Sequence, residues 1–273
     1  MQHPALTVLV VGATGSIGRL VVAKALRRGH AVCALTRSPS KARFEKQVGI
    51  VVGDVTDPDS LAAAVDGVDA VIFTLGSDGL GKTGAERIDY EGVRNVILAL
   101  QSRTVRVALM TSIGVTNRDG EYNRSTEAHD WKRRSERLVR ASGLPYTIVR
   151  PGWFDYNDAD QHKLVMLQGD CRQAGNASDG GVAREEIARV LVHSLDSSAA
   201  LGKTFELVAE YGPAQPDLDA VLAPLQPDPP TVVDDAGDFD AVLDMRNMPL
   251  QDEPSRVLVT LQALREQALA RGA

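Results

Sequence analysis

Cysteine is scarce in this chain, and the two cysteines present form no recognisable pattern. Cys33 and Cys171 are far apart and without metal-ligand spacing. This excludes a disulfide framework, so we predict no metal site and a reducing compartment. Cys33 falls in an apolar stretch, where a small buried residue fits.

An excess of basic residues is also missing. The formal net charge is −6, which excludes a basic field over the whole protein and predicts no nucleic-acid partner. The one dense basic run is Lys132-Arg133-Arg134. We interpret it as a solvated helix face rather than as a nucleic-acid patch.

Long hydrophobic runs are absent as well. No apolar stretch approaches the roughly 20 residues that span a bilayer. The first residues, Met1-Gln2-His3-Pro4, lack the basic and then apolar pattern of a signal peptide. We therefore expect a soluble cytoplasmic protein with no membrane partner.

The dominant feature of the sequence is a regular alternation of apolar runs, typical of strands, with amphipathic patterns, typical of helices. Hydrophobic residues make up 44% of it, enough for a substantial core. The predicted strands span residues 6–11, 31–36, 49–53, 69–74, 105–111 and 146–150. Helical patterns lie between them, over residues 16–28, 61–65, 86–100 and 126–142. This order predicts an α/β fold, a doubly wound parallel sheet that binds ligands at the carboxyl ends of its strands.

The strongest local motif follows the first strand. The turn Gly12-Ala13-Thr14-Gly15-Ser16-Ile17-Gly18 joins a buried strand to a helix that opens at Ser16. Gly12 suits backbone angles that a Cβ disfavours, Gly15 lets a ligand approach the main chain, and Gly18 allows the helix to pack closely on the strand. The N–H groups of the helix's first turn suit a pyrophosphate. We predict a dinucleotide site that includes Gly12, Thr14, Gly15, Ser16, Ile17 and Gly18.

The residue after the second strand indicates which dinucleotide binds. An NAD site places an acid there to bind the ribose 2′-hydroxyl, whereas this chain has Arg37, followed by Ser38. An arginine can pair with a 2′-phosphate through two charge-assisted hydrogen bonds. We therefore predict NADP(H) as the cofactor, with NAD(H) as the alternative, and Arg37 and Ser38 as phosphate contacts.

Loops after the next two strands are expected to contact the adenosine. Asp54 should reach the adenine edge, with Val55 packing on the ring. The alternative role for Asp54 is a helix cap, for which Asp57 is better placed. The loop Thr74-Leu75-Gly76 is expected to run beneath the adenosine ribose.

The second half of the chain has a weaker pattern. We place the dinucleotide-binding core in residues 1–152 and a smaller C-terminal substrate lobe, which partly completes that core, in residues 153–273. Strands are predicted over residues 163–168 and 204–208, and helices over residues 184–195 and 252–269. The stretch from Gly212 to Pro230 is rich in proline and aspartate, and we expect it to be irregular.

These features together resemble a known family. The chain is similar to the atypical short-chain dehydrogenase/reductases, in the NAD(P)-binding group that includes nitrogen-metabolite-repressor-like proteins and relatives of flavin reductase. The resemblance covers residues 5–152. Its motifs are Gly12-Ala13-Thr14-Gly15-Ser16-Ile17-Gly18, Gly53-Asp54-Val55, Asp89-Tyr90-Glu91-Gly92-Val93-Arg94-Asn95, Met110-Thr111-Ser112-Ile113-Gly114, and Ser142-Gly143-Leu144-Pro145-Tyr146-Thr147-Ile148-Val149-Arg150-Pro151-Gly152.

The resemblance implies a Rossmann fold and several site positions. Ser112 takes the place of the family's active-site serine, Pro151 would lie against the nicotinamide, and Asn95 would tie neighbouring loops together. The family's Tyr-x-x-x-Lys motif places its lysine at Lys132, where it would bind the nicotinamide ribose. The tyrosine position falls on Ala128, so the usual proton donor is missing.

Three interpretations of the missing tyrosine stay open. Another group supplies the proton, with His129 adjacent and Tyr122 or Tyr156 on nearby loops. Alternatively, hydride passes to an acceptor that needs no protein acid, such as a quinone or a flavin. In the third interpretation the domain only senses the nucleotide. For a catalytic protein we assign the chemistry to Ser112, Lys132 and His129.

Aromatic residues, only 4% of the chain, gather after the sixth strand. Trp153, Phe154 and Tyr156 are placed where a substrate would meet the nicotinamide, which predicts a flat, partly apolar ligand. A hydrophobic lid would have the same composition.

The leading hypothesis is an NADP(H)-binding oxidoreductase that reduces a small carbonyl or quinone-like acceptor. The rival is a non-catalytic NADP(H) sensor or regulatory partner protein. A sugar-nucleotide epimerase or dehydratase ranks third, because that chemistry normally uses the same missing tyrosine. The acceptor, any protein partner and the oligomeric state do not follow from the sequence.

Overall fold

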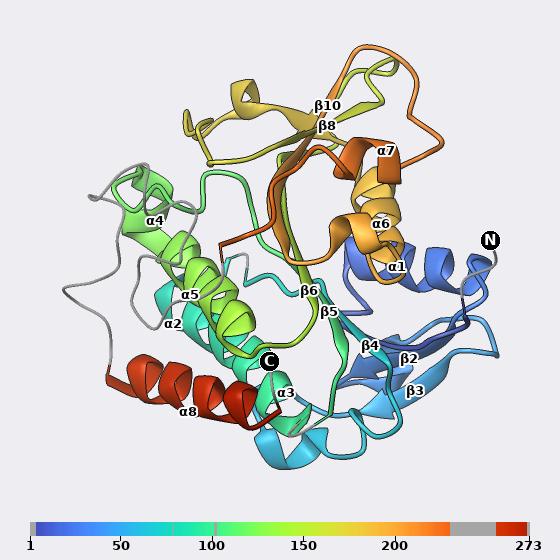
Figure 1. Cartoon of the computed structure of the whole chain (residues 1–273), viewed down its shortest axis with the longest axis vertical. Helices are drawn as coiled ribbons and strands as arrows, with labels where there is room; N and C mark the ends of the chain where they lie inside the picture. Colours follow the sequence, from blue (N-terminus) through green and yellow to red (C-terminus); the bar gives the residue numbers. More distant parts are fainter. Residues whose placement is uncertain (1–3, 78, 101–102, 230–254, 272–273) are drawn as a thin grey trace.

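The protein is built around one large sheet, seen in a computed structural model that describes residues 4–77, 79–100, 103–229 and 255–271. The sheet has eight strands in the order β3-β2-β1-β4-β5-β6-β10-β8. Its pairings are parallel except that of β8 with β10, which is antiparallel. Helices cover both of its faces (Figure 1). The predicted doubly wound α/β fold is confirmed.

The strands coincide with the apolar runs of the sequence. They are β1 (Thr7–Val11), β2 (Ala31–Thr36), β3 (Gly49–Val52), β4 (Ala70–Phe73), β5 (Arg106–Met110), β6 (Tyr146–Pro151), β8 (Lys163–Leu167) and β10 (Lys203–Glu210). A separate short pair joins β7 (Trp153–Phe154) to β9 (Gly181–Val182). The predicted strands are confirmed, with small differences at their ends.

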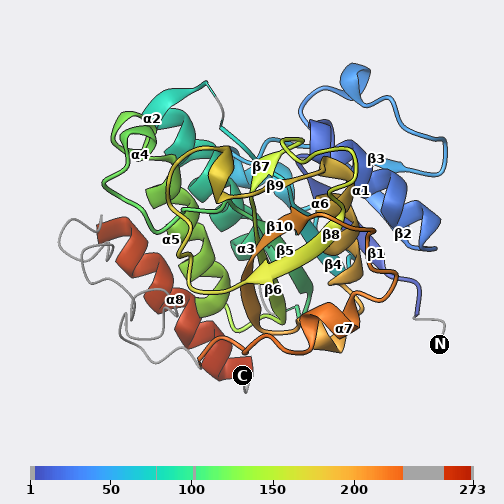
Figure 2. The same cartoon turned by 90° about the horizontal axis from the view of Figure 1, so that it is seen from above.

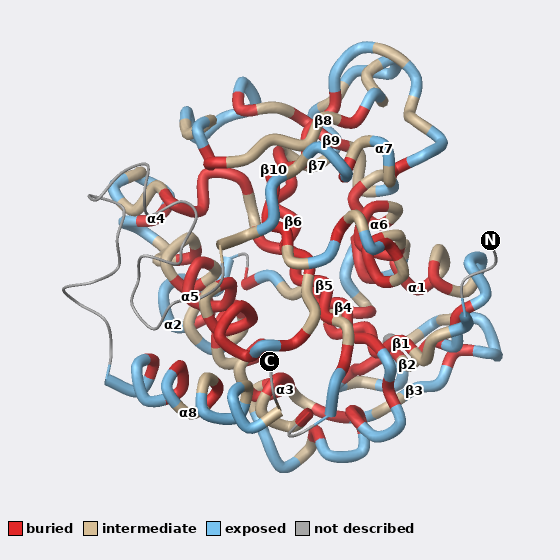
Figure 3. The backbone as a smooth tube through the Cα atoms, viewed as in Figure 1, coloured by how far each residue is buried: buried red, intermediate tan, exposed pale blue. Residues whose placement is uncertain are grey.

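Two layers of helices enclose the sheet. Helices α1 (Ser16–Arg27) and α6 (Arg184–His193) pack on one face, while α3 (Gly92–Leu100) and α5 (Ala128–Ala141) pack on the other (Figures 1 and 2). Helix α8 (Ser255–Arg271) lies outside α5. Figure 3 shows the central strands β1, β4, β5 and β6 buried over nearly all of their length, which explains why they read as continuous apolar runs.

The segment before α3 differs from the predicted helix over residues 86–100. It begins earlier, with α2 (Gly81–Gly84), and continues through a π-helical stretch at Ala85–Glu91. A π-helical turn inserts an extra residue and is frequent at functional sites. Here it carries the buried Asp89, whose partner is described below.

Two other helix predictions need correction. The helix expected over residues 61–65 is only a 3₁₀ turn at Pro58–Leu61, although Asp57 does cap it by accepting the N–H of Asp59 at 3.3 Å. The helix expected over residues 126–142 is α5, preceded by the separate α4 (Glu121–Thr126). Glu127 separates the two because its φ of 56° is left-handed.

The basic run on α5 is not a solvated helix face, so that interpretation is wrong. Arg133 is 1% exposed and Arg134 is 4% exposed. The guanidinium of Arg134 lies 4.5 Å from the centroid of the Trp131 ring, and α8 packs against α5. Burial of these side chains depends on distant segments that pack around α5, which the pattern of a single helix cannot reveal.

The C-terminal part of the chain extends the sheet. Strands β8 and β10 continue it beyond β6, and the predicted boundary at residue 152, between β6 and β7, stays a prediction. The stretch after Gly212 contains the short α7 (Asp219–Leu222). Pro230 and residues 252–254 of the predicted last helix lie outside the described residues. None of the helices that the structure describes has the length and apolarity needed to cross a bilayer.

Candidate active site

The glycine turn after β1 is as tight as its sequence predicts. Gly12 has a φ of +89°, and a Cβ there would lie 2.8 Å from the carbonyl oxygen of Thr74. A Cβ on Gly18 would lie 2.1 Å from the carbonyl oxygen of Gly12. No side chain caps the start of α1, and its first turn contains no acid. The N–H groups at this helix end therefore suit a dinucleotide pyrophosphate.

A cavity of about 710 Å³ opens beside this turn, at the carboxyl ends of the strands. It has the size of a cofactor or ligand pocket. Many of the predicted site residues line it, namely Gly15, Ser16, Ile17, Thr74, Leu75, Gly76, Ser112, His129, Lys132, Pro151, Trp153, Phe154 and Tyr156. The fold thus brings together residues from loops that are far apart in sequence.

Other predicted nucleotide contacts lie outside the cavity wall, namely Gly12, Thr14, Gly18, Arg37, Ser38, Asp54 and Val55. Arg37 is on the surface, with its side chain 70% exposed and its Nη1 4.0 Å from Oδ2 of Asp54. Ser38 donates its backbone N–H to the hydroxyl of Thr36. An exposed guanidinium at the end of β2 is available to a 2′-phosphate.

Asp54 is partly engaged within its own turn. Its Oδ1 accepts both the N–H and the hydroxyl of Thr56, each at 2.9 Å. Burial raises the pKa of this carboxyl, but the Thr56 hydrogen bonds and the charges of Arg37 and Arg87 outweigh it, so the net pKa is lowered. Asp54 is therefore an anion at neutral pH, and its contact with adenine stays a prediction.

Asn95 and Val55 hold the loop after β3 against α3. The amide of Asn95 donates to the carbonyl oxygen of Val55 at 2.9 Å. The Val55 side chain is buried and lies close to Gly92 at the start of α3. Asn95 thus ties two neighbouring elements together, as the family resemblance implies.

Lys132 is held in place by a carboxylate to which we assigned no role from the sequence. Its Nζ lies 2.7 Å from Oδ1 of Asp89, and the two side chains are 14% and 1% exposed. The hydroxyl of Ser77 donates to the other oxygen of Asp89. An ammonium has three N–H donors, so this pair leaves Lys132 donors for ribose hydroxyls.

Ser112 follows β5 directly and has an unusual environment. Its Oγ is buried, and no described residue makes a hydrogen bond with it. A buried hydroxyl without a partner costs about 1–3 kcal/mol. A group kept at such a cost beside a large cavity is a candidate for binding a ligand atom.

His129 is the second residue of α5, and the centroid of its ring lies 5.1 Å from that of Tyr122. Burial lowers the pKa of its imidazole to about 4; the backbone hydrogen bond with Asn117 and the charge of Asp130 oppose this shift, and the charge of Lys132 adds to it. No described residue bonds to its buried Nδ1. His129 is therefore a neutral imidazole at pH 7.

The low pKa of His129 predicts a loss of stability in mild acid. The unfolded chain binds a proton near pH 6.5 and the folded chain only near pH 4. Stability is therefore complete above about pH 6.5 and falls as the pH decreases towards 4, by up to about 3 kcal/mol. His129→Gln should flatten this dependence. Urea unfolding at pH 7 and pH 4.5 measures it, and equal slopes for both proteins would contradict the prediction.

The predicted substrate residues form one wall of the cavity. Trp153 and Tyr156 pack edge to face, with ring centroids 5.7 Å apart. The guanidinium of Arg184 lies 5.3 Å from the centroid of Phe154. Tyr122, on α4, also lines the cavity. A cavity wall made of several aromatic side chains suits a flat conjugated ligand.

Several residues of the site carry no assignment from the sequence. Asp89 belongs to a family motif, but its pairing with Lys132 needs the π-helical stretch and α5 to lie side by side. Asn117 and Gln173 line the cavity from loops without a distinctive pattern. An acid within the matched motif Asp89–Asn95 is the one signal that could have singled out Asp89.

Comparison with known proteins agrees with this geometry. A family model described as NAD(P)H-binding matches residues 12–198. A sanguinarine reductase of Eschscholzia californica is 27% identical over 262 residues, which cover 80% of this chain and 95% of the reductase. A putative NAD-dependent epimerase/dehydratase from Bacillus halodurans has a TM-score of 0.66 at 25% identity, over 77% of this chain and 96% of that one.

A relative of another kind is a photosystem II assembly factor of Synechocystis. It is 30% identical over 205 residues, which cover 74% of this chain. The match spans only 62% of the length of that factor. Similar proteins thus include both enzymes and an assembly factor.

Proposed function

Because this chain belongs to the NAD(P)H-binding family, and within it to the atypical short-chain dehydrogenase/reductases, we propose that it is an NADPH-dependent reductase of a flat, quinone-like or small carbonyl acceptor. The observation that carries this proposal is the buried Ser112 hydroxyl, without a partner among the described residues, on a cavity that Lys132 also lines. A sensor would use Lys132 to bind the nucleotide, but it would have no acceptor oxygen for the Ser112 hydroxyl to contact.

The residues of the cavity have distinct roles in this reaction. The uncapped start of α1 holds the pyrophosphate, and Lys132 donates to the nicotinamide ribose. The bound cofactor supplies the hydride. Ser112 donates its hydroxyl proton in a hydrogen bond to the acceptor oxygen, where negative charge develops. The aromatic wall orients the acceptor ring.

The charge state of His129 supports an acceptor that needs no resident acid. A pKa of about 4 leaves roughly one molecule in a thousand protonated at pH 7. The proton can come from water after hydride transfer to a quinone or flavin, because these acceptors spread the negative charge over a conjugated ring. We therefore favour them over simple aldehydes and ketones.

A screen of acceptors tests the proposal. NADPH oxidation is followed at fixed enzyme with quinones, flavins, aldehydes and ketones, together with NADPH affinity. We expect turnover with one or more quinones or flavins. Tight cofactor binding without turnover on any acceptor would reject the reductase.

Arg37 is expected to set the cofactor preference. Arg37→Asp removes the cation at the end of β2 and places an anion against the 2′-phosphate, so NADPH should bind about 10- to 100-fold more weakly. NADH affinity should change little. Arg43→Asp, an equal charge change at an exposed site in the same loop, is the control. Isothermal titration with both cofactors measures the effect, and equal losses for NADPH and NADH would refute this role.

A non-catalytic, nucleotide-dependent partner protein is the second candidate. It is favoured by Ala128, 2% exposed, at the position of the family's tyrosine, and the assembly factor among the relatives supports it. This candidate predicts a protein partner whose affinity depends on bound NADP(H). Capture experiments with and without the nucleotide distinguish it from the reductase.

A further inference from the structure

The backbone on either side of Ser112 is held by buried carboxylates from other parts of the chain. On the N-terminal side, Thr111 donates its hydroxyl to Oε1 of Glu136 at 2.6 Å. Glu136 lies on α5, one turn after Lys132 and on the same face. This contact therefore joins the Ser112 loop to the helix that carries Lys132.

On the C-terminal side the partner is Asp170, which follows β8. Its Oδ1 accepts the N–H of Gly114 at 2.7 Å, and its Oδ2 accepts the N–H and the hydroxyl of Thr116 at 2.8 and 2.9 Å. Ser112 thus sits in a loop whose two ends are each bonded to a buried acid.

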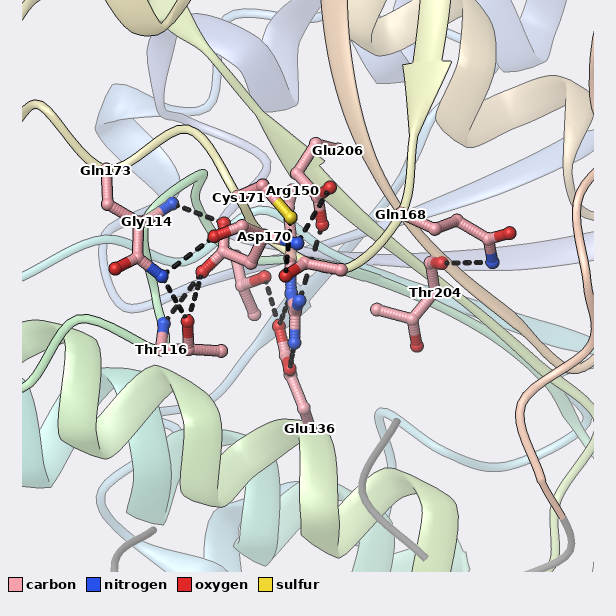
Figure 4. Close-up of polar contacts among 12 residues, drawn as sticks. Gly114, Thr116, Glu136, Arg150, Gln168, Asp170, Cys171, Gln173, Thr204 and Glu206 are labelled. Carbon is pink, nitrogen blue, oxygen red and sulfur yellow. Dashed lines mark hydrogen bonds and ion pairs between the residues drawn. The ribbon is translucent and has the colours of Figure 1, made fainter. Parts of the chain in front are cut away.

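Two further residues connect these acids. Arg150 on β6 donates to both oxygens of Glu136 and, at 3.4 Å, to Oε1 of Glu206 on β10. Oε2 of Glu206 accepts the backbone N–H of Asp170 at 3.1 Å. Figure 4 shows Arg150 between the two glutamates, with Asp170 beside Glu206. We call Glu136, Arg150, Glu206 and Asp170 the polar ring, because they close a path from Thr111 back to Thr116.

The polar ring is unlike a group of residues whose role is to stabilise the fold. Its members are at most 2% exposed, and it contains three carboxyl groups and one guanidinium, with Arg140 3.5 Å from Glu136. Desolvating such groups costs several kcal/mol each, and apolar residues often give equal stability. Directional hydrogen bonds do fix the relative positions of α5, β6, β10 and two loops, which apolar packing does less strictly.

We propose that the polar ring positions Ser112 relative to Lys132, and that Asp170 and Glu136 are positioning residues for hydride transfer. This inference rests on the proposed reductase function. Neither residue lines the cavity, so both act through the loop between Thr111 and Thr116. A displacement of about 1 Å at a reacting group can cost about 100-fold in rate.

Asp170→Asn is the central test. The substitution keeps the size of the side chain and suits the left-handed backbone at this position, where φ is 48°. It replaces one acceptor oxygen by an amide that cannot accept the N–H of Gly114 or Thr116. Asp196→Asn is the matched control, because Asp196 is 5% exposed and ion-paired to Arg28, far from the Ser112 loop.

The measurements are the single-turnover rate of NADPH oxidation with the best acceptor, NADPH affinity, urea unfolding, and hydrogen exchange of residues 112–117. We expect Asp170→Asn to lower the rate about 10- to 100-fold, with NADPH affinity unchanged and with faster exchange in that segment. Asp196→Asn should lower stability alone. The proposal is overturned if the two variants lose rate only in proportion to stability, or if exchange at 112–117 is unchanged.

A second variant tests the proposal independently, in case Asp170→Asn fails to fold. Thr111→Val removes only the hydroxyl that bonds Glu136 and should slow hydride transfer, while Thr111→Ser, which keeps it, should restore the rate. If the wild-type protein turns over no acceptor, the reductase proposal fails; hydrogen exchange then still decides whether the polar ring holds the loop. Equal rates for the valine and serine variants would count against the positioning role.

Discussion

Ser112→Ala is expected to slow hydride transfer about 10²- to 10³-fold without destabilising the protein. The hydroxyl is buried and bonds to no described residue, so its loss removes an unsatisfied polar group and should raise the free energy of unfolding by about 1 kcal/mol. The rate should fall because the acceptor oxygen loses its donor in the transition state. Stopped-flow NADPH oxidation and urea unfolding measure the two effects.

Ser194→Ala is the matched control for this prediction. Ser194 is fully buried at the end of α6, and its hydroxyl donates to the carbonyl oxygen of Leu191 at 2.8 Å. Its removal should lower stability by about 1 kcal/mol and leave the rate unchanged. A Ser112→Ala protein as active as the wild type would remove Ser112 from the mechanism.

Lys132→Met is expected to have the largest effect on stability and to abolish turnover. It would leave the carboxylate of Asp89, 1% exposed, without its cation. Removing one partner of a buried pair costs about 3–5 kcal/mol. Thermal and urea unfolding measure this loss, and cofactor titration reports the lost contact with the ribose.

The double variant Lys132→Met with Asp89→Asn separates the two roles of the lysine. It should recover most of the stability, because no buried charge is left unpaired, but not the turnover. Lys82→Met is the control, since Lys82 pairs with Glu127 on the surface, where the side chains are 55% and 38% exposed; it should cost less than about 1 kcal/mol. Full activity in the double variant would show that Lys132 acts only in folding.

Much of the fold was predictable from local patterns. The strands follow from apolar runs of four to eight residues, and their parallel arrangement follows from the helices between them. Errors occurred where tertiary packing overrides a local signal. The turn at Pro58–Leu61 does not continue as an α-helix, and Arg133 is buried although its neighbours in sequence are charged.

Many of the residues that line the candidate site could be predicted from the sequence, but the contacts that hold them in place could not. Ser112, His129 and Lys132 all line the cavity, as do the three aromatic residues after β6. The side chains that hold Lys132 and the Ser112 loop in place were not predictable, because they come from segments far away in sequence. Lys132 meets Asp89 across two helices, and Gly114 meets Asp170 across 56 residues.

The sequence by itself determined the strands, the glycine turn and the presence of an arginine directly after β2, because each depends on residues that are close together in the chain. A glycine at a left-handed position and an alternation of apolar runs act over a few residues. The tertiary structure decided which charges are buried and paired, which hydroxyl has no partner, and how the Ser112 loop is held. Those properties depend on α5, β6, β10 and the loop after β8 lying side by side, an arrangement of segments that are far apart in the chain.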